Sequence, residues 1–257
     1  MRIVVKIGTS TIAHATGRLN IRQVEELCKV MSDLKNAGHE IIIVTSGAIG
    51  MGVGKLSLGC RPKDVPTKQA AAAVGQCELM YTYDRLFSLY SHIVAQILLV
   101  GADLKDEERH VNFRNTVKRL LELGAIPIIN ENDTVATEEL GIGDNDTLAA
   151  VVAVSLNADV LVLMSDIDGL YSDDPHKNSD AKLIPVVTEI TQDILALAGA
   201  KGSELATGGM ATKLHAAQIS MESGVDMIIT NGTNPECLYA IVGGRDIGTK
   251  FVGKVKK

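Results

Sequence analysis

The chain has 257 residues, 46% of them hydrophobic, which is enough to bury a sizeable core. Its 25 basic and 31 acidic residues give a formal net charge of −6, which argues against general binding to nucleic acids or anionic membranes. The longest apolar run, Leu148 to Leu156, is too short to span a bilayer, and residues 1–10 lack the pattern of a signal peptide. The four cysteines show no Cys-x-x-Cys spacing. We therefore expect a cytoplasmic protein without a disulfide framework.

Strand-like and helix-like segments alternate along the chain. The β-branched run Ile3 to Ile7 predicts the first strand. Asn20 with Gln23, in capping-box spacing, predicts the start of a helix that ends near Gly38. Further strands are expected at residues 40–45, 93–100, 126–130, 160–164 and 226–230, and further helices at 67–89, 111–123, 145–156 and 211–222.

Strands separated by helices of ten or more residues are typical of βαβ units. Such units build a parallel sheet with helices on both faces. No Pro/Ser-rich linker divides the chain. We therefore predict one α/β domain over residues 1–257, a three-layer sandwich around a mainly parallel open sheet.

Several common enzyme motifs are absent. A Walker A loop around Gly54-Lys55 fails because Ile49 replaces the first glycine and Leu56 the hydroxyl residue. The Rossmann pattern, the His-Glu-x-x-His pattern and the Gly-x-Ser-x-Gly elbow do not occur either. These absences exclude P-loop enzymes, classical dinucleotide enzymes, zincins and α/β-hydrolases.

Polar and glycine-rich motifs follow the expected strands. In an open parallel sheet, ligands bind beyond the carboxyl ends of the strands. Taken singly, each motif is explained as a tight turn or a helix cap. Their expected position along one edge of one sheet favours a binding site instead. The motifs are Lys6 to Ser10, Thr45 to Ala48, Asn130 to Asp133, Gly143 to Thr147, and Ser165-Asp166.

Lysines and carboxylates among these motifs suit phosphoryl transfer, whose transition state needs placed cations and backbone N–H groups. Lys6 ends an apolar strand beside a glycine, although a lysine there can also be a solvated edge residue. Lys213 follows a glycine pair that opens a helix, although the same pattern fits a flexible loop with a solvated lysine. Asp133, Asp144 and Asp146 make sense if they hold cations, namely Mg²⁺, a lysine, or the ammonium of an amino-acid substrate.

Together these motifs resemble one known family. Lys6-Ile-Gly-Thr-Ser10, Val44 to Ile49, Asn130-Glu-Asn-Asp133, Gly143-Asp-Asn-Asp146 and Thr207 to Lys213 resemble the glutamate-phosphorylating branch of the amino acid kinase family. Leu163 to Pro175 resembles the nucleotide segment of the wider family. The resemblance extends from residue 3 to residue 213 and implies the amino acid kinase fold.

The resemblance implies ATP-dependent phosphorylation of the L-glutamate side-chain carboxylate to L-glutamyl 5-phosphate, the first step of proline biosynthesis. It implies Mg²⁺ carried mainly by the ATP phosphates, with no metal-ligating side chain assigned. It further implies proline as a feedback inhibitor and a homo-oligomer, with no nucleic-acid or membrane partner. Many members carry a C-terminal PUA domain, and we expect none in residues 1–257.

Carried over position by position, the resemblance implies a role for each site residue. Lys6 and Lys213 would contact ATP phosphates, Asp144 would orient the two lysines, and Asp146 would lie beside the substrate as the fourth member of the catalytic set. Glutamate would be held by Ser46, Asp133 and Asn145. ATP would be bound by Lys6, Gly8, Ser165, Asp166, Thr207, Gly208, Gly209, Met210, Ala211, Thr212 and Lys213.

Two alternatives stay open. The same fold and nucleotide segment would serve a kinase acting on aspartate, acetylglutamate, carbamate or UMP. The acidic loops at 130–133 and 144–146 favour a substrate with a free ammonium group, which disfavours acetylglutamate and UMP. A catalytically silent amino-acid sensor is the alternative from another class, but a sensor needs neither Lys6 nor Lys213.

Overall fold

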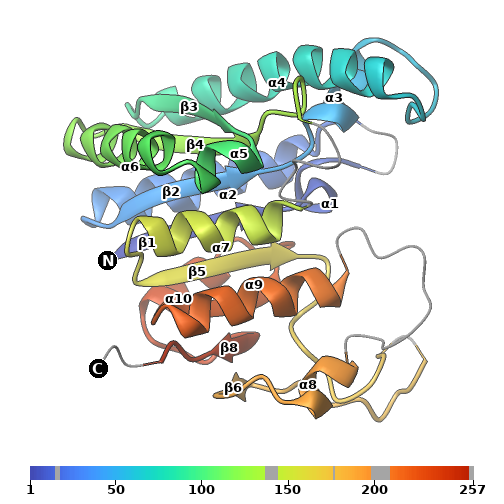
Figure 1. Cartoon of the computed structure of the whole chain (residues 1–257), viewed down its shortest axis with the longest axis vertical. Helices are drawn as coiled ribbons and strands as arrows, with labels where there is room; N and C mark the ends of the chain where they lie inside the picture. Colours follow the sequence, from blue (N-terminus) through green and yellow to red (C-terminus); the bar gives the residue numbers. More distant parts are fainter. Residues whose placement is uncertain (15–17, 137–143, 176, 198–208, 255–257) are drawn as a thin grey trace.

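An eight-stranded sheet forms the middle of the molecule (Figure 1). The computed structural model describes residues 1–14, 18–136, 144–175, 177–197 and 209–254. Across the sheet the strand order is β3-β4-β2-β1-β5-β7-β8-β6, and all neighbouring strands are parallel except the antiparallel pair β7–β8. The predicted, mainly parallel open sheet is confirmed. The strands are β1 (Arg2–Ile7), β2 (Glu40–Thr45), β3 (Val94–Leu99), β4 (Ile126–Glu131), β5 (Val160–Ser165), β6 (Val186–Val187), β7 (Asp226–Asn231) and β8 (Thr249–Phe251).

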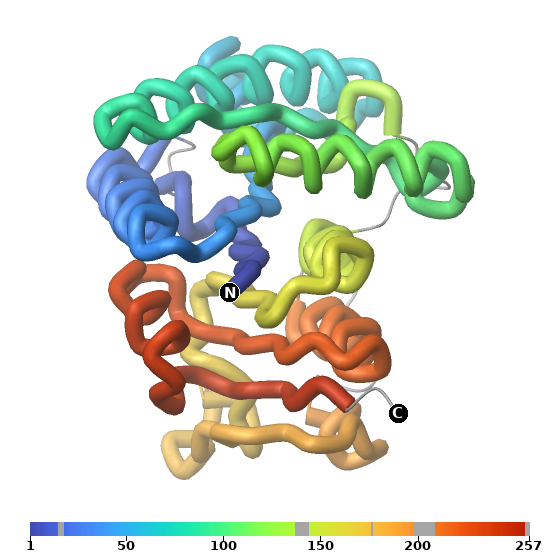
Figure 2. Tube along the Cα trace, turned by 90° about the vertical axis from the view of Figure 1, so that its left-hand side faces the viewer, coloured from blue at the N-terminus to red at the C-terminus, as the bar shows by residue number. Residues whose placement is uncertain are grey.

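Helices cover both faces of this sheet, as Figure 2 shows for α2 and α10 on one side of the strands and α7 and α9 on the other. The three-layer sandwich is therefore confirmed. The helices are α1 (Thr9–Ile12), α2 (Ile21–Asn36), α3 (Ala48–Lys55), α4 (Val65–Ser88), α5 (Gly101–Lys105), α6 (Glu107–Glu122), α7 (Asn145–Ser155), α8 (Gln192–Leu197), α9 (Met210–Glu222) and α10 (Cys237–Val242).

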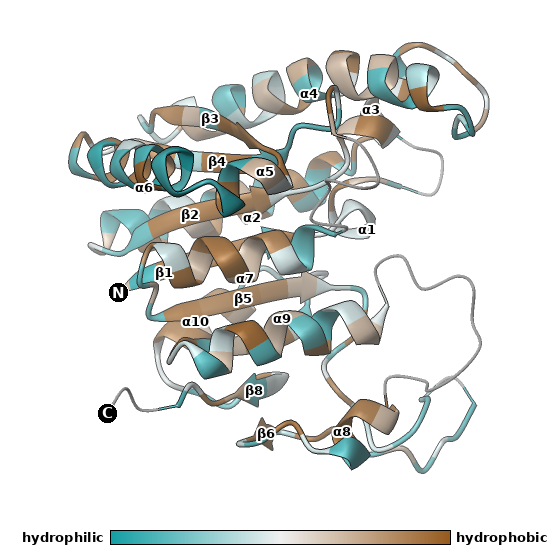
Figure 3. Cartoon of the chain, in the orientation of Figure 1, coloured by the Kyte–Doolittle hydropathy of each residue, from teal (hydrophilic) through white to brown (hydrophobic). Residues whose placement is uncertain are grey.

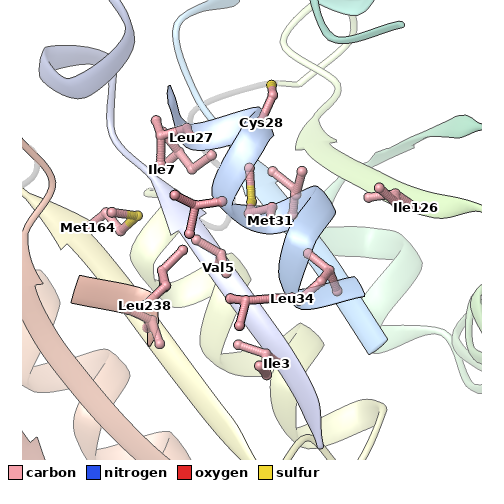
Figure 4. Packing of buried hydrophobic residues seen from close by; sticks show 14 of the residues in the cluster. Ile3, Val5, Ile7, Leu27, Cys28, Met31, Leu34, Ile126, Met164 and Leu238 are labelled. Carbon is pink, nitrogen blue, oxygen red and sulfur yellow. The ribbon is translucent and has the colours of Figure 1, made fainter. Parts of the chain in front are cut away.

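Alternation along β1 divides the core into two layers. Ile3, Val5 and Ile7 point to the face covered by α2, where they pack with the apolar stripe of that helix (Figure 4). Val4 points to the opposite face, into the layer that α6, α7 and α9 complete. Because side chains alternate with a period of two, Lys6 shares the face of Val4. The strand therefore directs the Lys6 ammonium toward α7 and α9.

Most predicted elements appear within a few residues of their expected ends, and the exceptions have local causes. Asn20 Oδ1 accepts a hydrogen bond from Gln23 N at 3.4 Å, as expected of a cap. The Gln23 side chain does not complete the capping box, because it donates to the carbonyl of Gly232 instead. Helix α6 begins a turn earlier than predicted, because Asp106 caps it by accepting from Arg109 N at 2.9 Å.

Helix α3 was not predicted, and its glycines explain both the omission and its position. A Cβ on Gly52 would lie 1.8 Å from the carbonyl oxygen of Ala71, and one on Gly75 would lie 1.7 Å from that of Ala48. Only glycine permits so close an approach of α3 and α4. The turn before α3 also uses a glycine, Gly47, with φ of +99°. These contacts fix the loop that follows β2.

Hydropathy follows the layers. The central strands and α7 are predominantly hydrophobic, whereas the outer helix α6 is largely hydrophilic (Figure 3). None of the helices in the described part of the chain is long and apolar enough to cross a membrane.

Candidate active site

The polar motifs gather at the carboxyl edge of the sheet, around the central strands β1, β2, β4 and β5. From β1 the chain passes to β2 on one side, whereas β5, which follows β4 in the sequence, lies on the other side of β1. A crevice forms where neighbouring strands diverge in this way, and it is the usual ligand site of open α/β sheets. Lys6 lies in β1 beside this point, and α7 begins over it.

Asp146, in the first turn of α7, binds two lysines at once. Its Oδ1 lies 2.6 Å from Lys6 Nζ, and its Oδ2 lies 3.1 Å from Lys213 Nζ. Thr212 Oγ1 approaches the same Oδ2 at 3.4 Å. The three charged side chains are buried, with 3% of Asp146, 12% of Lys6 and 8% of Lys213 exposed. The structure therefore holds two ammonium groups on the two oxygens of one carboxylate.

Helix packing places these groups. Helices α7 and α9 lie side by side on one face of the sheet, and both begin at its carboxyl edge (Figure 1). Small buried residues between them allow the close approach. Burial raises the pKa of Asp146, but the Lys6 and Lys213 ammonium groups outweigh it and hold the pKa of this carboxyl below its ordinary value. Asp146 is therefore ionised at neutral pH and holds both lysines, while its single negative charge offsets only one of their two positive charges.

Asp144 was expected to orient the two lysines, but its carboxylate binds Thr147 instead. Its Oδ1 accepts from Thr147 N at 2.8 Å, and its Oδ2 accepts from Thr147 Oγ1 at 2.9 Å. This is the geometry of a helix N-cap. The carboxylate that contacts and orients the two lysines is Asp146, two residues further along the chain.

Asn145 lies between these two acids in the sequence and connects α7 to the ends of two strands, β2 and β4. Its Nδ2 donates to Ser46 Oγ at 2.8 Å, to the carbonyl of Thr45 at 2.9 Å and to Asn130 Oδ1 at 3.1 Å. Its Oδ1 is buried and has no hydrogen-bond partner among the described residues. A buried amide oxygen in this state can accept a hydrogen bond from an N–H group that enters the site. The structure thus brings together Ser46 and Asn145, which were both predicted to bind substrate.

Asp133 lies in the turn after β4, and among the described residues no buried lysine compensates it. Burial, reinforced by the neighbouring charge of Glu131, raises the pKa of Asp133 to about 6, and Arg61 opposes this only in part. The residue borders a small cavity of about 10 Å³ that Ala48 and Gln76 also line. A partly buried carboxylate with a raised pKa favours an incoming cation.

The expected nucleotide residues occupy the neighbouring strand end and helix start. Ser165, the last residue of β5, donates from Oγ to Asp166 Oδ1 at 3.1 Å. A Cβ on Gly8 would lie 3.6 Å from Lys6 Nζ, so this backbone passes close to the ammonium. Gly209 caps α9, whose first turn contains Met210, Ala211, Thr212 and Lys213. Thr207 and Gly208 lie outside the described residues.

Comparison with known proteins decides the family, because the family model described as "Amino acid kinase family" matches residues 1–231. The chain belongs to the amino acid kinase family. A protein of Clostridium perfringens named "Glutamate 5-kinase" is 51% identical over 257 residues, covering 98% of this chain and 96% of the relative. Another of the same name from Clostridium acetobutylicum is 50% identical over 255 residues, covering 99% of this chain and 96% of the relative.

Solved structures agree on the fold. The isopentenyl phosphate kinase of T. acidophilum, in a product complex, superposes with a TM-score of 0.68 over 97% of this chain and 99% of that one. The two sequences are only 21% identical, so this likeness carries the amino acid kinase fold and nothing finer.

In this amino acid kinase, the structure gives two residues of the site, Asn130 and Gln76, roles that the sequence did not predict. Asn130 belongs to an expected motif, but its role as the partner of Asn145 was not foreseen. Gln76, which accepts from Asn130 Nδ2 at 2.9 Å, was not foreseen at all. A glutamine at the end of the alanine-rich run of α4 is the one signal that sequence offers for it. Within the described residues, no three His, Cys, Asp or Glu side chains gather into a metal site.

Proposed function

We propose that this chain transfers the terminal phosphoryl group of ATP to the side-chain carboxylate of L-glutamate, giving ADP and L-glutamyl 5-phosphate. The pair of buried lysines on Asp146 is the observation that carries the proposal. The two relatives named "Glutamate 5-kinase", about half identical over almost the whole chain, support the choice of substrate.

Lys6 and Lys213 act on the phosphoryl side. An oxygen of the glutamate side chain attacks the terminal phosphorus, and the bond between that phosphorus and the ADP oxygen breaks. The attacking carboxylate is ionised at neutral pH, so no general base has to remove a proton. Negative charge grows on the phosphoryl oxygens, and two ammonium groups fixed by Asp146 stabilise it without reorganising.

Mg²⁺ is proposed to accompany ATP, bound mainly through phosphate oxygens, and it supplies further positive charge there. The site suits this arrangement, because Asp146 is already neutralised by the two lysines. The lysines remain the protein's own cations for the transferring group.

The substrate's ammonium group is proposed to lie between Asp133 and Asn145. Asp133 offers a carboxylate that Arg61 compensates only in part, and Asn145 Oδ1 offers a buried acceptor without a hydrogen-bond partner in the described structure. Both groups suit a donor with positive charge. An N-acetylated amino acid has no charge there and would leave Asp133 unpaired, which favours glutamate over acetylglutamate.

The test is a substrate panel with purified protein, ATP and Mg²⁺, in which ADP release is measured for glutamate, aspartate, acetylglutamate, carbamate and UMP. Glutamate should give the highest kcat/KM, and its acyl phosphate should be trapped by hydroxylamine as the hydroxamate. If another acceptor gives a higher kcat/KM, that acceptor and not glutamate is the substrate. Binding of glutamate without ADP release would support the silent sensor.

Proline is proposed to inhibit by occupying the same site, since it shares the α-carboxylate and cationic amine of glutamate but lacks the carboxylate that receives phosphate. Proline should then raise the KM for glutamate more than it lowers kcat. It should also raise Tm as its concentration climbs, because it binds the folded state. If millimolar proline changes neither the KM for glutamate nor Tm, this mode of inhibition is rejected. The homo-oligomer, the cytoplasmic location and the place in proline biosynthesis remain predictions.

A further inference from the structure

Four side-chain amides form a hydrogen-bonded chain that runs from the edge of the sheet to the substrate side of the site. Gln96 of β3 accepts at Oε1 from Gln76 Nε2 at 3.0 Å, and Gln76 of α4 accepts at Oε1 from Asn130 Nδ2 at 2.9 Å. Asn130, in β4, accepts at Oδ1 from Asn145 Nδ2 at 3.1 Å. Each amide in the interior of the chain therefore donates to one neighbour and accepts from the other.

Backbone groups fix the direction of this chain. Asn130 Oδ1 also accepts from Glu131 N at 2.9 Å, and Asn145 Nδ2 also donates to the carbonyl of Thr45 at 2.9 Å. If the Asn130 amide turned over, its NH₂ group would face two donors. Its Nδ2 must therefore point toward α4, where Gln76 Oε1 is its acceptor.

Burial makes that acceptor hard to replace. Asn130 is 1% exposed and Gln76 is 8% exposed, so bulk water does not reach the bond between them. A buried N–H group that loses its acceptor is costly, and its side chain turns to find another. Turning Asn130 would remove one of the three acceptors of Asn145 Nδ2 and so hold less firmly the side chain whose Oδ1 has no partner among the described residues.

Helix α4 also contacts the other side of the same site. Gly75, next to Gln76, packs against the backbone of Ala48 in the first turn of α3. The Tyr83 hydroxyl lies 3.0 Å from Thr45 Oγ1, at the end of β2. One rigid helix thus supports Asn130 through Gln76 and supports the Thr45–Ser46 segment through its packing.

We infer that Gln76 is a positioning residue that fixes the amides of Asn130 and Asn145 for the ammonium group of the amino-acid substrate, an inference that rests on the function proposed above. Both polar ends of Gln76 are engaged within the protein, so it acts through Asn130. It has no contact with Lys6, Asp146 or Lys213 among the hydrogen bonds and ion pairs described here. Its loss should therefore weaken glutamate binding and leave ATP binding unchanged.

The test compares Gln76→Met, which keeps length and removes both polar groups, with Gln76→Glu, which keeps an acceptor for Asn130. Gln76→Met should raise the KM for glutamate about tenfold, with the KM for ATP changed less than about twofold. Gln76→Glu should stay within about threefold of the wild type for glutamate. The matched control is Gln96→Met at the exposed end of the chain, which leaves the Gln76–Asn130 bond in place and should change neither KM.

A double-mutant cycle separates positioning from general damage. In an Asn145→Ala background, Gln76→Met should raise the KM for glutamate no further, because its effect passes through Asn145. A full tenfold rise there, or equal losses for glutamate and ATP, would overturn the inference. If Gln76→Met does not fold, Gln76→Asn replaces it. That variant moves the acceptor back by one methylene and should raise the KM for glutamate at least about threefold. An unchanged KM would also overturn the inference.

The activity of the wild type with glutamate distinguishes failure of the proposed function from failure of the positioning role of Gln76. If it does not phosphorylate glutamate, the proposed function falls, and the inference falls with it. If it does, and the KM for glutamate is the same in Gln76→Met as in the wild type, only the positioning role of Gln76 is lost.

Discussion

The two acidic regions of the site treat a buried carboxylate in opposite ways. Asp146 is compensated by Lys6 and Lys213, and its pKa lies below the ordinary value although burial alone would raise it. At Asp133 the charge of Arg61 only partly offsets the effects of burial and of Glu131, and the pKa is raised to about 6. Two carboxylates at one edge of one sheet therefore differ in how far neighbouring positive charges already compensate them.

This difference suggests a division of labour. A carboxylate whose charge is already neutralised serves to hold the lysines in place, and the positive charge that remains on the pair of lysines attracts phosphate. A carboxylate that is partly buried and uncompensated gains most from a cation that arrives with the substrate. The first region is thus prepared for phosphoryl transfer, and the second for the ammonium group.

Loss of a lysine should have the largest effect. Lys6→Ala or Lys213→Ala should lower kcat by about 100-fold or more, the scale of losing one transition-state donor. Lys55→Ala is the control, because this exposed lysine only pairs with Glu78 on the surface. A near-normal kcat in Lys6→Ala would remove that residue from the mechanism.

Substitutions of the two acids at the start of α7, Asp144 and Asp146, should differ in their effect on kcat. Asp146→Asn removes the charge between the lysines and should lower kcat by about 10- to 100-fold, because hydrogen bonds to charged groups contribute about 1.5–3 kcal/mol. Asp144→Asn keeps the helix cap, since asparagine caps as well as aspartate, and should change kcat by less than about threefold. The opposite order would restore to Asp144 the role that the resemblance implied.

The pH dependence of glutamate use should follow Asp133. With a pKa of about 6, this carboxyl is ionised at pH 7.5 and takes up a proton as the pH falls through 6. The kcat/KM for glutamate should therefore fall about tenfold between pH 7.5 and pH 5, where glutamate's own side chain is still largely ionised. Asp133→Asn should lack this limb of the profile. An identical limb in the variant would assign it to another group.

The smallest expected effect is on thermal stability, where Asp133→Asn and Asp146→Asn should shift Tm in opposite directions. Because the pKa of Asp133 is higher in the folded chain, its contribution to stability is greatest at low pH and is lost as the pH rises through 6. Asp133→Asn should therefore raise Tm at pH 7.5 and raise it less at pH 5. Asp146→Asn should lower Tm at pH 7.5, since it leaves two buried lysines without their carboxylate. Thermal unfolding of both variants at each pH measures this.

Sequence predicted six of the eight strands, all but the short β6 and β8, together with both helix layers and the edge where the site lies, because strand periodicity and the position of polar motifs are local signals. It did not distinguish Asp144 from Asp146. Both begin the same helix, and which of them faces the lysines depends on how α7 is rotated against β1 and α9. Gln76 stayed hidden for a related reason, since its partner Asn130 lies on another element and comes close only through the sheet order. Helix α3 was missed because its glycines disfavour a helix locally, and its packing on α4 overrides that preference.

Removing the ammonium from the substrate tests the division of labour most directly. Glutarate is glutamate without its amino group, so the ratio of kcat/KM for L-glutamate to that for glutarate reports what the enzyme gains from the ammonium. We expect Asp133→Asn to lower this ratio at least about tenfold, because a charge-assisted hydrogen bond is lost for glutamate alone. Asp146→Asn should lower both kcat/KM values and leave their ratio unchanged. An unchanged ratio in Asp133→Asn, or a collapsed one in Asp146→Asn, would contradict the account.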